Sequence, residues 1–358
     1  MALRLNPASE QLVKGVNAYI CSMQLYKDHD LSALNSFGLG VHCKYLIDIH
    51  DENEIPRAVE MAIHFGLPYL FLGGGSNMLF TKDYEGSIIR LCIEGISAEE
   101  TGDEVLVTAG AGVVWNDLVQ HCVQNGWGGI ENLALIPGTV GASPIQNIGA
   151  YGVELQDVFV SLRGFHVDQG FLEFDKKGCR FGYRQSIFKT DLKQKFIVSS
   201  VTLRLSKKPQ LQLGYGAIGE ELERRGITAP SIADVAAVVS SIRVSKLPDP
   251  KTIGNAGSFF KNPEIPNEQF QRIKIDHPAL VGYPAGEGIT KVSAAWMIEA
   301  CGWKGKKVGN TGTYEKHALV LVNHGGATGN EISALARQIQ YSVYEKFGLA
   351  IEPEVNII

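Results

Sequence analysis

The most unusual stretch of the chain is GWGGIENLALIPGTVGASPIQNIGAYG, which spans Gly126–Gly152. These 27 residues contain seven glycines and a single charged side chain, Glu131. An exposed loop would carry more charge, and a core strand would carry fewer glycines, because glycine weakens a strand interior. We therefore predict buried backbone that wraps closely around another group, with a set of plain glycine-rich turns as the alternative.

A second glycine-rich stretch lies upstream, at Gly73-Gly74-Gly75-Ser76-Asn77. It follows the strand-like runs Tyr45–Ile49 and Tyr69–Leu72, which flank an amphipathic stretch from Glu52 to Phe65, so this region predicts a β-α-β unit. Three consecutive glycines leave no Cβ to keep a ligand away from the backbone, and such a turn can present several N–H groups to an anion. A tight turn after a buried strand is the alternative.

Downstream, the pattern divides into two further regions. Short strand-like runs alternate with turns between Ile88 and Leu205, with a helical pattern near 116–124, which predicts an α+β domain. A third region runs from about Gln212 to Phe347. We expect helices at Ile232–Ser245, Ser293–Cys301 and Asn330–Phe347, with Asn330 as the N-cap of the last, and strands at His317–Val322 and Leu349–Ile358.

Charge and composition exclude several classes of protein. Lys and Arg total 33 against 38 Asp and Glu, a net charge of -5, so no basic surface for a nucleic acid is expected. No segment reaches the roughly 18 apolar residues of a membrane helix, and the N-terminus lacks the pattern of a signal peptide. We expect a cytoplasmic protein, with residues 1–22 as a helical extension or the product of an upstream start codon.

The cysteines argue against a metal centre. The chain has six, and none forms a C-x-x-C pair or stands at metal-ligand spacing from histidine. We therefore expect free thiols in a reducing compartment and no metal site.

Three short clusters carry side chains suited to binding or proton transfer. Phe181–Lys189 places Arg184 beside aromatic residues, as in a carboxylate or phosphate site or in a surface arginine–aromatic stack. Asn255–Pro263 sets Ser258 between small residues and two phenylalanines, where its hydroxyl could relay a proton or cap a turn. Arg243–Pro250 carries two cations before a proline-stiffened loop, and by itself is typical of a solvated helix end.

The chain also contains a G-x-G-x-x-G motif at Gly214–Gly219, with Asp234 downstream. This motif binds dinucleotides when it joins a buried strand to a helix. The preceding Lys207–Gln212 is a poor buried strand, so a surface turn or a mobile loop that presents Tyr215 is the favoured interpretation.

Several motifs occur together in an order that closely resembles the UDP-N-acetylenolpyruvoylglucosamine reductases. They are Asn35–Gly38, Gly73–Asn77, Ile136–Ala142, Gln146–Gly152, Arg180–Arg184, Gly254–Pro263 and Glu352–Val355. The match runs from Asn35 to the C-terminus, and the Tyr215 loop resembles the longer of the two forms of the enzyme. The resemblance implies an enzyme of peptidoglycan precursor synthesis, which reduces the enolpyruvyl group of UDP-N-acetylglucosamine enolpyruvate to the lactyl ether of UDP-N-acetylmuramate.

The resemblance also implies the architecture. The fold class would be α+β in three domains, with an FAD-binding fold of the vanillyl-alcohol-oxidase (PCMH) type and a C-terminal α+β substrate-binding domain. The expected parts are an N-terminal extension (1–30), FAD-binding subdomains (31–86 and 87–207), the substrate-binding domain (208–348) and a C-terminal strand (349–358) that returns to the active site. FAD and NADPH are the implied cofactors, and NADPH and the UDP-sugar would share one cleft. We expect a monomer with no nucleic-acid or membrane partner.

Residue roles follow from the resemblance, position by position. Hydride from N5 of reduced FAD would reach the terminal vinyl carbon of the substrate. Arg184 and Glu354 would polarise the substrate carboxylate and stabilise the enolic intermediate, while Ser258 would donate the proton to carbon 2. The implied cofactor-binding residues are Gly73, Gly74, Gly75, Ser76, Asn77, Pro137, Gly138, Thr139, Gly141, Ala142, Ile148, Gly149 and Ala150. The implied substrate-binding residues are Tyr151, Tyr215, Lys246, Asn262 and His317.

Two other functions stay open on the residues alone. A flavin oxidase or dehydrogenase of the same fold, acting on a small alcohol or hydroxy acid, would keep the glycine-rich stretches but would not need Arg184, Ser258 and Glu354 together. A flavin- or nucleotide-sugar-binding regulator would bind its ligand without consuming NADPH.

Overall fold

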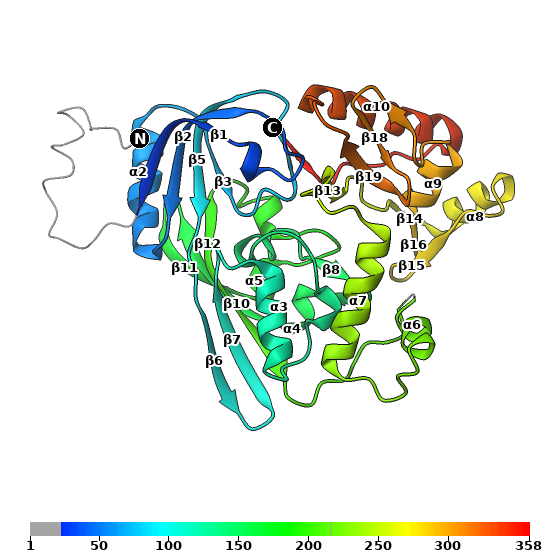
Figure 1. Ribbon diagram of the computed structural model, residues 1–358, viewed down its shortest axis with the longest axis horizontal. Helices are drawn as coiled ribbons and strands as arrows, with labels where there is room; N and C mark the ends of the chain where they lie inside the picture. Colours follow the sequence, from blue (N-terminus) through cyan, green and yellow to red (C-terminus); the bar gives the residue numbers. More distant parts are fainter. Residues whose placement is uncertain (1–22, 216) are drawn as a thin grey trace, which may run out of the picture.

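The computed structural model describes residues 23–215 and 217–358. Positions 1–22 of the predicted extension therefore lie outside the described residues, as does Gly216 of the G-x-G-x-x-G motif. Figure 1 shows three groups of elements that follow one another along the chain: a blue sheet, a cyan-to-green sheet with its helices, and a yellow-to-red group. Residues 207–213 are not in a strand, so the G-x-G-x-x-G motif lacks the strand that a dinucleotide site requires.

The first sheet contains the predicted β-α-β unit. Its strand order is β1 (Gln24–Asp30), β2 (His42–Ile49), β5 (Tyr84–Leu91) and β3 (Tyr69–Leu72). β5 pairs in parallel with both β2 and β3, so it separates the two strands that the sequence predicts. The 3-10 turn η1 (Ser32–Leu34) follows β1, and η2 (Glu52–Glu54) leads into helix α2 (Ile55–His64), which packs on one face of the sheet. The other face packs on the third group of elements, so the parallel strands β2, β5 and β3 have neighbours on both sides, whereas β1 is largely exposed.

The second sheet is antiparallel throughout. Its order is β11 (Gly170–Asp175), β10 (Phe159–His166), β12 (Phe196–Ser206), β7 (Glu104–Gly110) and β6 (Ile96–Thr101). Helices α3 (Trp115–Gln124), α6 (Ile218–Arg224) and α7 (Ile232–Lys246) share one apolar core with β7 and β12. Helix α7 thus packs on the second sheet, although it follows the boundary expected at residue 207. The domain boundaries stay a prediction, and this packing favours grouping α6 and α7 with the second sheet.

The stretch Gly126–Gly152 has little regular structure, and its residues are buried or partly buried except at Gly126, Pro137 and Gly152. Its short elements are the 3-10 turns η3 (Glu131–Leu133) and η4 (Val140–Ala142) and strand β8 (Gly149–Ala150), which pairs with β9 (Val153–Glu154) ahead of helix α4 (Leu155–Val158). A Cβ on Gly141 would lie only 2.6 Å from the Cβ of Ala111. Close packing therefore requires glycine at this position.

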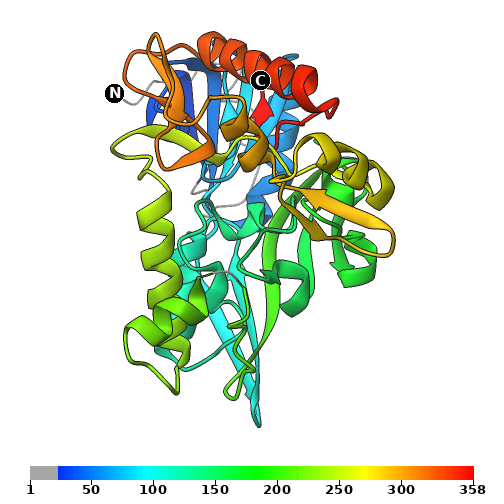
Figure 2. The same cartoon turned by 90° about the vertical axis from the view of Figure 1, so that its right-hand side faces the viewer.

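The third group combines two small sheets. The larger has the order β13 (Gly254–Ser258), β19 (His317–Asn323), β18 (Thr311–Tyr314) and β17 (Lys307–Val308), and the smaller has the order β14 (Glu264–Pro266), β16 (Ile289–Val292) and β15 (Gly282–Pro284). Figure 2 shows the long red helix α10 (Gly329–Phe347) across the top of the molecule. It packs with α9 (Ala294–Ala300) against the larger sheet, while α8 (Asn267–Asp276) contacts the smaller one. The three predicted helices and the His317–Val322 strand are confirmed to within one residue at each end.

The N-cap of α10 is Thr328, so the prediction of Asn330 is wrong. Thr328 Oγ1 accepts a hydrogen bond from the Glu331 N–H at 3.2 Å, and the Glu331 carboxylate accepts one from the Thr328 N–H at 2.7 Å. This reciprocal capping box satisfies two N–H groups at once, which a single asparagine cap does not.

The C-terminal segment joins the first and third groups. It was expected to be one strand, but only β20 (Asn356–Ile357) is regular, in parallel with β4 (Met78–Leu79) of the first group. Pro353 forms an isolated bridge with Phe260, and the Glu354 N–H donates to the Phe259 carbonyl at 2.8 Å. Because proline has no N–H to donate, it interrupts regular pairing here. Glu354 is thereby held between two parts of the chain.

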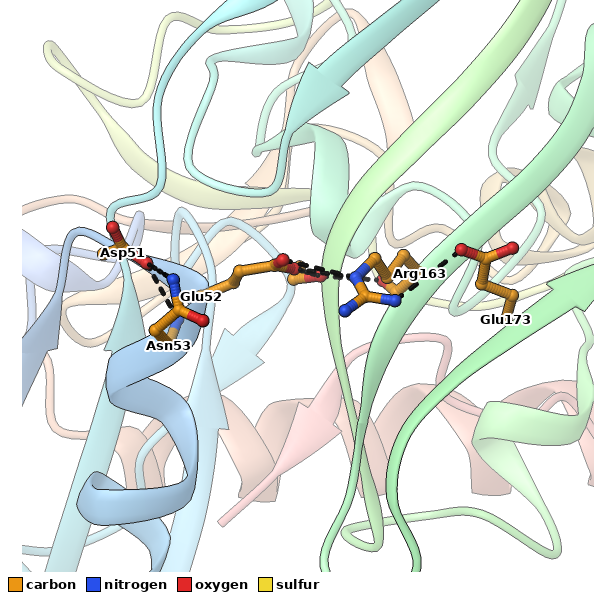
Figure 3. Close-up of polar contacts among 6 residues, drawn as sticks. Asp51, Glu52, Asn53, Arg163 and Glu173 are labelled. Atoms are coloured by element: carbon orange, nitrogen blue, oxygen red, sulfur yellow. Dashed lines mark hydrogen bonds and ion pairs between the residues drawn. The ribbon is translucent and has the colours of Figure 1, made fainter.

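A polar contact joins the first two sheets on the side of α2 (Figure 3). Glu52, which begins η2, accepts hydrogen bonds from Arg163 Nε at 3.1 Å and from Ser199 Oγ at 3.0 Å. Arg163 lies on β10, where it also approaches Glu173 at 3.7 Å and stacks over the Phe171 ring. The contact joins the face of the first sheet that carries α2 to the second sheet.

Candidate active site

Two neighbouring cavities lie where the three groups meet. The larger, of about 680 Å³, is lined by the loop Gly73–Asn77 between β3 and β4 and by residues around η4. The smaller, of about 230 Å³, is lined by residues of the second and third groups. The two cavities share the wall residues Ser76, Asn77, Pro137, Gln146, Ile148 and Glu354. Ligands in the two cavities could therefore touch across this wall.

The glycine-rich loop and the η4 turn approach each other closely at the larger cavity. A Cβ on Gly73 would lie 2.7 Å from Thr139 Oγ1, and one on Gly74 would lie 3.0 Å from the Gly138 Cα. Thr139 Oγ1 is buried and has no hydrogen-bond partner among the described residues. A buried hydroxyl without a partner at a glycine-lined wall suits a phosphate oxygen of a bound ligand.

The rest of the larger cavity suits FAD as well. Leu72, Phe188 and Phe196 give it apolar walls for a flat aromatic ring. Most of the predicted cofactor residues line it: Gly73, Gly74, Gly75, Ser76, Asn77, Pro137, Thr139, Gly141, Ala142 and Ile148. Of the other three, Gly149 lines the smaller cavity, Gly138 touches the loop at Gly74, and Ala150 lies in β8 outside both linings.

Arg184 and Glu354 meet in the smaller cavity. Arg184 Nε lies 3.3 Å from Glu354 Oε1, and Arg184 Nη2 donates to the Gly149 carbonyl at 2.6 Å. Burial raises the pKa of Glu354 above its usual value, although the nearby cations Arg184, Lys189 and Lys261 act to lower it. Glu354 therefore keeps its proton to a higher pH than a solvated carboxyl does, and in that form it can donate a hydrogen bond.

Ser258 faces the same cavity from the end of β13. The preceding Gly257 has a φ of 68°, and Asn255 holds this turn by accepting a hydrogen bond from the Gly257 N–H at 3.0 Å. No hydrogen bond of the Ser258 hydroxyl occurs within the described part of the chain, so the hydroxyl is available to a ligand. The C-terminal segment crosses beside it, since Glu354 N bonds to Phe259 O.

Two cations near the cavities were not among the predicted site residues. Arg243 lines the smaller cavity, where burial lowers its pKa, so the interpretation of its segment as a solvated helix end is wrong for this residue. Lys189 lines the larger cavity and donates to the Arg184 carbonyl at 3.1 Å. Burial also lowers the pKa of Lys189, with Glu354 opposing this effect. The sequence shows the positive charge of both residues. It does not show that they are buried, because their burial depends on segments that are distant in the chain.

The predicted substrate-binding residues are not all in the cavity. Asn262 lines it and accepts a hydrogen bond from the Ala294 N–H at 2.9 Å. The rings of Tyr151 and Tyr215 meet edge to face at 6.2 Å, outside both linings. His317 begins β19, and its pKa is lowered by burial and then by Lys246 and Lys304, with Glu299 opposing this effect. Lys304, which sequence reasoning missed, thus lies with two predicted residues in a cationic cluster, although it also pairs with Glu299 at 3.0 Å.

Within residues 23–215 and 217–358, no group of histidine, cysteine, aspartate or glutamate side chains could hold a metal ion. The five cysteines in this part of the chain are free thiols. No helix in the same ranges is long and apolar enough to cross a membrane.

Comparison with known proteins matches this arrangement to a family. An FAD binding domain model matches residues 43–169, and the model of the UDP-N-acetylenolpyruvoylglucosamine reductase C-terminal domain matches residues 249–358. The UDP-N-acetylenolpyruvoylglucosamine reductase of Pseudomonas aeruginosa is 46% identical over 338 residues, which cover 94% of this chain and 99% of that protein. The chain belongs to the UDP-N-acetylenolpyruvoylglucosamine reductase family. It is an FAD-dependent oxidoreductase of that family.

Solved structures agree with the fold. The UDP-N-acetylenolpyruvylglucosamine reductase of Thermus caldophilus superposes with a TM-score of 0.65 at 25% identity, covering 94% of this chain and 98% of that one. The 6-hydroxy-D-nicotine oxidase of Arthrobacter nicotinovorans superposes with a TM-score of 0.50 at 13% identity, covering 92% and 87%, which concerns the fold alone. The family resemblance and the α+β fold of the vanillyl-alcohol-oxidase type are confirmed.

Replacing Gly74 by alanine is expected to weaken FAD binding at least about tenfold, because the added Cβ would press on the Gly138 backbone and part the two loops. Gly40→Ala is the matched control, since a Cβ there meets nothing within 4 Å and this glycine lines neither cavity. Titration of each apoprotein with FAD, followed by flavin fluorescence, measures the effect. Equal affinity for Gly74→Ala and Gly40→Ala would show that the close approach of the loops is not needed for FAD.

Proposed function

We propose that this chain reduces the enolpyruvyl group of UDP-N-acetylglucosamine enolpyruvate to the lactyl ether of UDP-N-acetylmuramate, with NADPH as reductant, in peptidoglycan precursor synthesis. The observation that carries the proposal is the meeting of Arg184, Ser258 and Glu354 at one cavity, which shares a wall with the cavity suited to FAD. A flavin oxidase acting on a small alcohol does not need this set of side chains. A regulator that only binds ligands is at odds with membership of a reductase family.

The charge around the smaller cavity supports a substrate with a carboxylate. Arg184 and Arg243 line the cavity, and Lys189 and Lys261 lie near enough to act on the pKa of Glu354. Among the described residues that line it, Glu354 is the only acidic one, and burial raises its pKa above the usual value. Cations in excess, with an arginine that can bind a carboxylate through two parallel hydrogen bonds, favour an anionic group there.

The side chains present can carry out the proton and charge chemistry of this reduction. Bound FAD supplies the hydride that adds to the terminal vinyl carbon. Addition at that carbon leaves negative charge on the neighbouring carbon and in the substrate carboxylate. Arg184 donates to the carboxylate, and Glu354, in its protonated form, donates a further hydrogen bond, so both stabilise charge where it develops. Ser258 donates its hydroxyl proton to carbon 2, which completes the addition of hydride and proton across the double bond.

The nucleotide end of the substrate extends toward the cationic cluster of Lys246, Lys304 and His317. Two lysines beside a partly buried histidine favour a diphosphate. Asn262 lines the smaller cavity together with the catalytic side chains and is able to donate its amide N–H groups to the substrate. Tyr215, half of whose surface is exposed, closes over the uridine diphosphate in this proposal, with Tyr151 beneath its ring.

NADPH and the UDP-sugar use the same cleft in turn. The family likeness supports binding of NADPH before the UDP-sugar. The position of the smaller cavity supports it too, because this cavity is the space beside the flavin wall that either a reductant or a substrate would need. A monomeric, cytoplasmic enzyme, with FAD held between the subdomains 31–86 and 87–207, completes the proposal.

Anaerobic absorbance spectra of the purified holoenzyme test the function directly. The flavin bands are recorded alone, after NADPH, and after UDP-N-acetylglucosamine enolpyruvate. We expect the bands to bleach with NADPH and to return with the substrate, because the two half-reactions share the flavin. Bands that return only when oxygen is admitted would overturn the substrate assignment and favour an oxidase. Protein that binds FAD but never bleaches with NADPH would overturn the proposed reductant.

A further inference from the structure

Asn147 is a fully buried side chain at the wall between the two cavities. It is 0% exposed, and its neighbours Gln146 and Ile148 line both cavities. Its backbone has a φ of 44°, in the left-handed region that asparagine adopts more readily than most residues. The roles assigned above do not include it.

The amide of Asn147 joins three segments. Its Nδ2 donates to the Gly182 carbonyl at 3.1 Å and to Glu154 Oε2 at 2.8 Å, while its Oδ1 accepts from the Gln156 N–H at 3.0 Å. Both groups facing Nδ2 are acceptors, and the group facing Oδ1 is a donor. The reverse orientation of the amide would lose all three hydrogen bonds, so the side chain has one satisfied orientation.

Gly182 begins the tight turn that carries Arg184. The backbones of Gly182 and Gln185 exchange hydrogen bonds of 3.0 and 3.1 Å, which leaves Tyr183 and Arg184 at the tip of the turn. Arg184 has a φ of 52°, a conformation that an arginine does not favour. Hydrogen bonds from outside the turn therefore help to hold Arg184 in this unfavourable conformation.

These external bonds come largely from the segment of Asn147. Asn147 holds the turn at the Gly182 carbonyl, and Gly149, two residues on, accepts from the Arg184 guanidinium at 2.6 Å. One short segment thus fixes both the backbone of the turn and the side chain that it presents to Glu354. Lys189 adds a third contact, to the Arg184 carbonyl.

We propose that Asn147 is a positioning residue for Arg184. By clamping the Gly182 carbonyl it keeps the guanidinium aligned with Glu354 and with the carboxylate that the smaller cavity takes. The inference rests on the proposed function, because it assigns Asn147 to the half-reaction in which the substrate is reduced. It gives Asn147 no part in the reduction of the flavin.

The test uses two variants, each measured in both half-reactions by anaerobic rapid mixing of the holoenzyme. Asn147→Gly removes the amide while allowing the left-handed backbone, and Asn147→Asp keeps the size but replaces the donating NH2 by oxygen. We expect substrate-dependent reoxidation of the flavin to slow by about 10- to 100-fold, the loss that a small misplacement of a catalytic group causes. Reduction by NADPH should change by less than about twofold.

A double-mutant cycle separates positioning from general damage. In the Arg184→Ala background, Asn147→Gly should slow reoxidation no further, because its effect passes through the arginine. Asn35→Ala is a matched control: Asn35 is also buried and bonds two backbone carbonyls and one backbone N–H, but it lines neither cavity. Its ratio of the two half-reaction rates should equal that of the unsubstituted enzyme.

Three results would overturn the inference: the same loss from Asn147→Gly with and without Arg184, equal slowing of both half-reactions, or loss of FAD from both variants. The last would mean that Asn147 maintains the flavin cavity instead. If Arg184→Ala itself leaves reoxidation unchanged, the proposed function of the arginine fails, and that result is distinguishable because it does not involve Asn147.

Discussion

Replacing Ser258 by alanine is expected to slow reoxidation of the flavin by substrate by roughly 100- to 10,000-fold, the range for loss of a positioned proton donor. The hydroxyl faces the smaller cavity and has no hydrogen-bond partner among the described residues. No group bonded to Ser258 could therefore take over the donation of the proton once the hydroxyl is removed. The reduction of the flavin by NADPH involves no proton from Ser258 and should keep its rate. Single-turnover absorbance of the two half-reactions measures both effects.

A control on another serine keeps this result interpretable. Ser245 bonds to the Ile242 carbonyl on α7 and lines neither cavity, so Ser245→Ala should leave both half-reactions unchanged. If Ser258→Ala retained full reoxidation, the proton would have to come from another group, and the assignment of Ser258 would be wrong. If both half-reactions slowed alike, Ser258 would be needed for the shape of the cavity and not for proton donation.

The second large effect is expected at Glu354. Replacement by alanine should slow reoxidation by roughly 100- to 1,000-fold, as loss of one hydrogen-bond donor to a developing negative charge does. Glu354→Gln should lose less, because the glutamine amide still donates a hydrogen bond from a neutral side chain. NADPH reduction should be nearly intact in both variants. Equal losses in alanine and glutamine variants would show that a carboxyl group, and not simply a neutral donor, is required.

The pH dependence of reoxidation gives an independent check on Glu354. Burial raises its pKa, so the carboxyl stays protonated at pH values where a solvated glutamate is ionised. As pH rises through that raised pKa, the side chain loses its donor and gains a negative charge beside the charge that develops on the substrate. The rate should therefore fall on the basic side, and this fall should be absent in Glu354→Gln. A profile in which glutamine leaves the basic limb in place would assign that limb to another group.

Much of the fold could be predicted because its signals are local. The alternation of strand and helix in 45–72 and the helical period of α7 and α10 depend on residues a few positions apart, and these elements are found within three residues at each end. Capping is also local, but at α10 only Asn330 was predicted, whereas the structure forms the capping box of Thr328 and Glu331.

Other features could not be predicted because they depend on distant partners. β5 pairs between β2 and β3, although it follows both in the chain and no sequence pattern indicates that a later strand separates them. The C-terminal segment is regular only where it meets β4, because the preceding Pro353, which has no N–H to donate, limits the pairing with Phe260 to an isolated bridge. Arg243 has the sequence of a solvated helix end, yet it lines the smaller cavity because the loops of two other regions cover it.

The family follows from the sequence, since several motifs in one order identify it without coordinates. The sequence also shows which side chains can donate a proton or hold an anion. The close approaches that require glycine at Gly74 and Gly141, and the meeting of Arg184, Ser258 and Glu354 at one cavity beside the flavin wall, depend instead on how distant segments pack. The same holds for the raised pKa of Glu354, because desolvation and the field of nearby cations depend on which segments pack around a carboxyl and not on its neighbours in the chain.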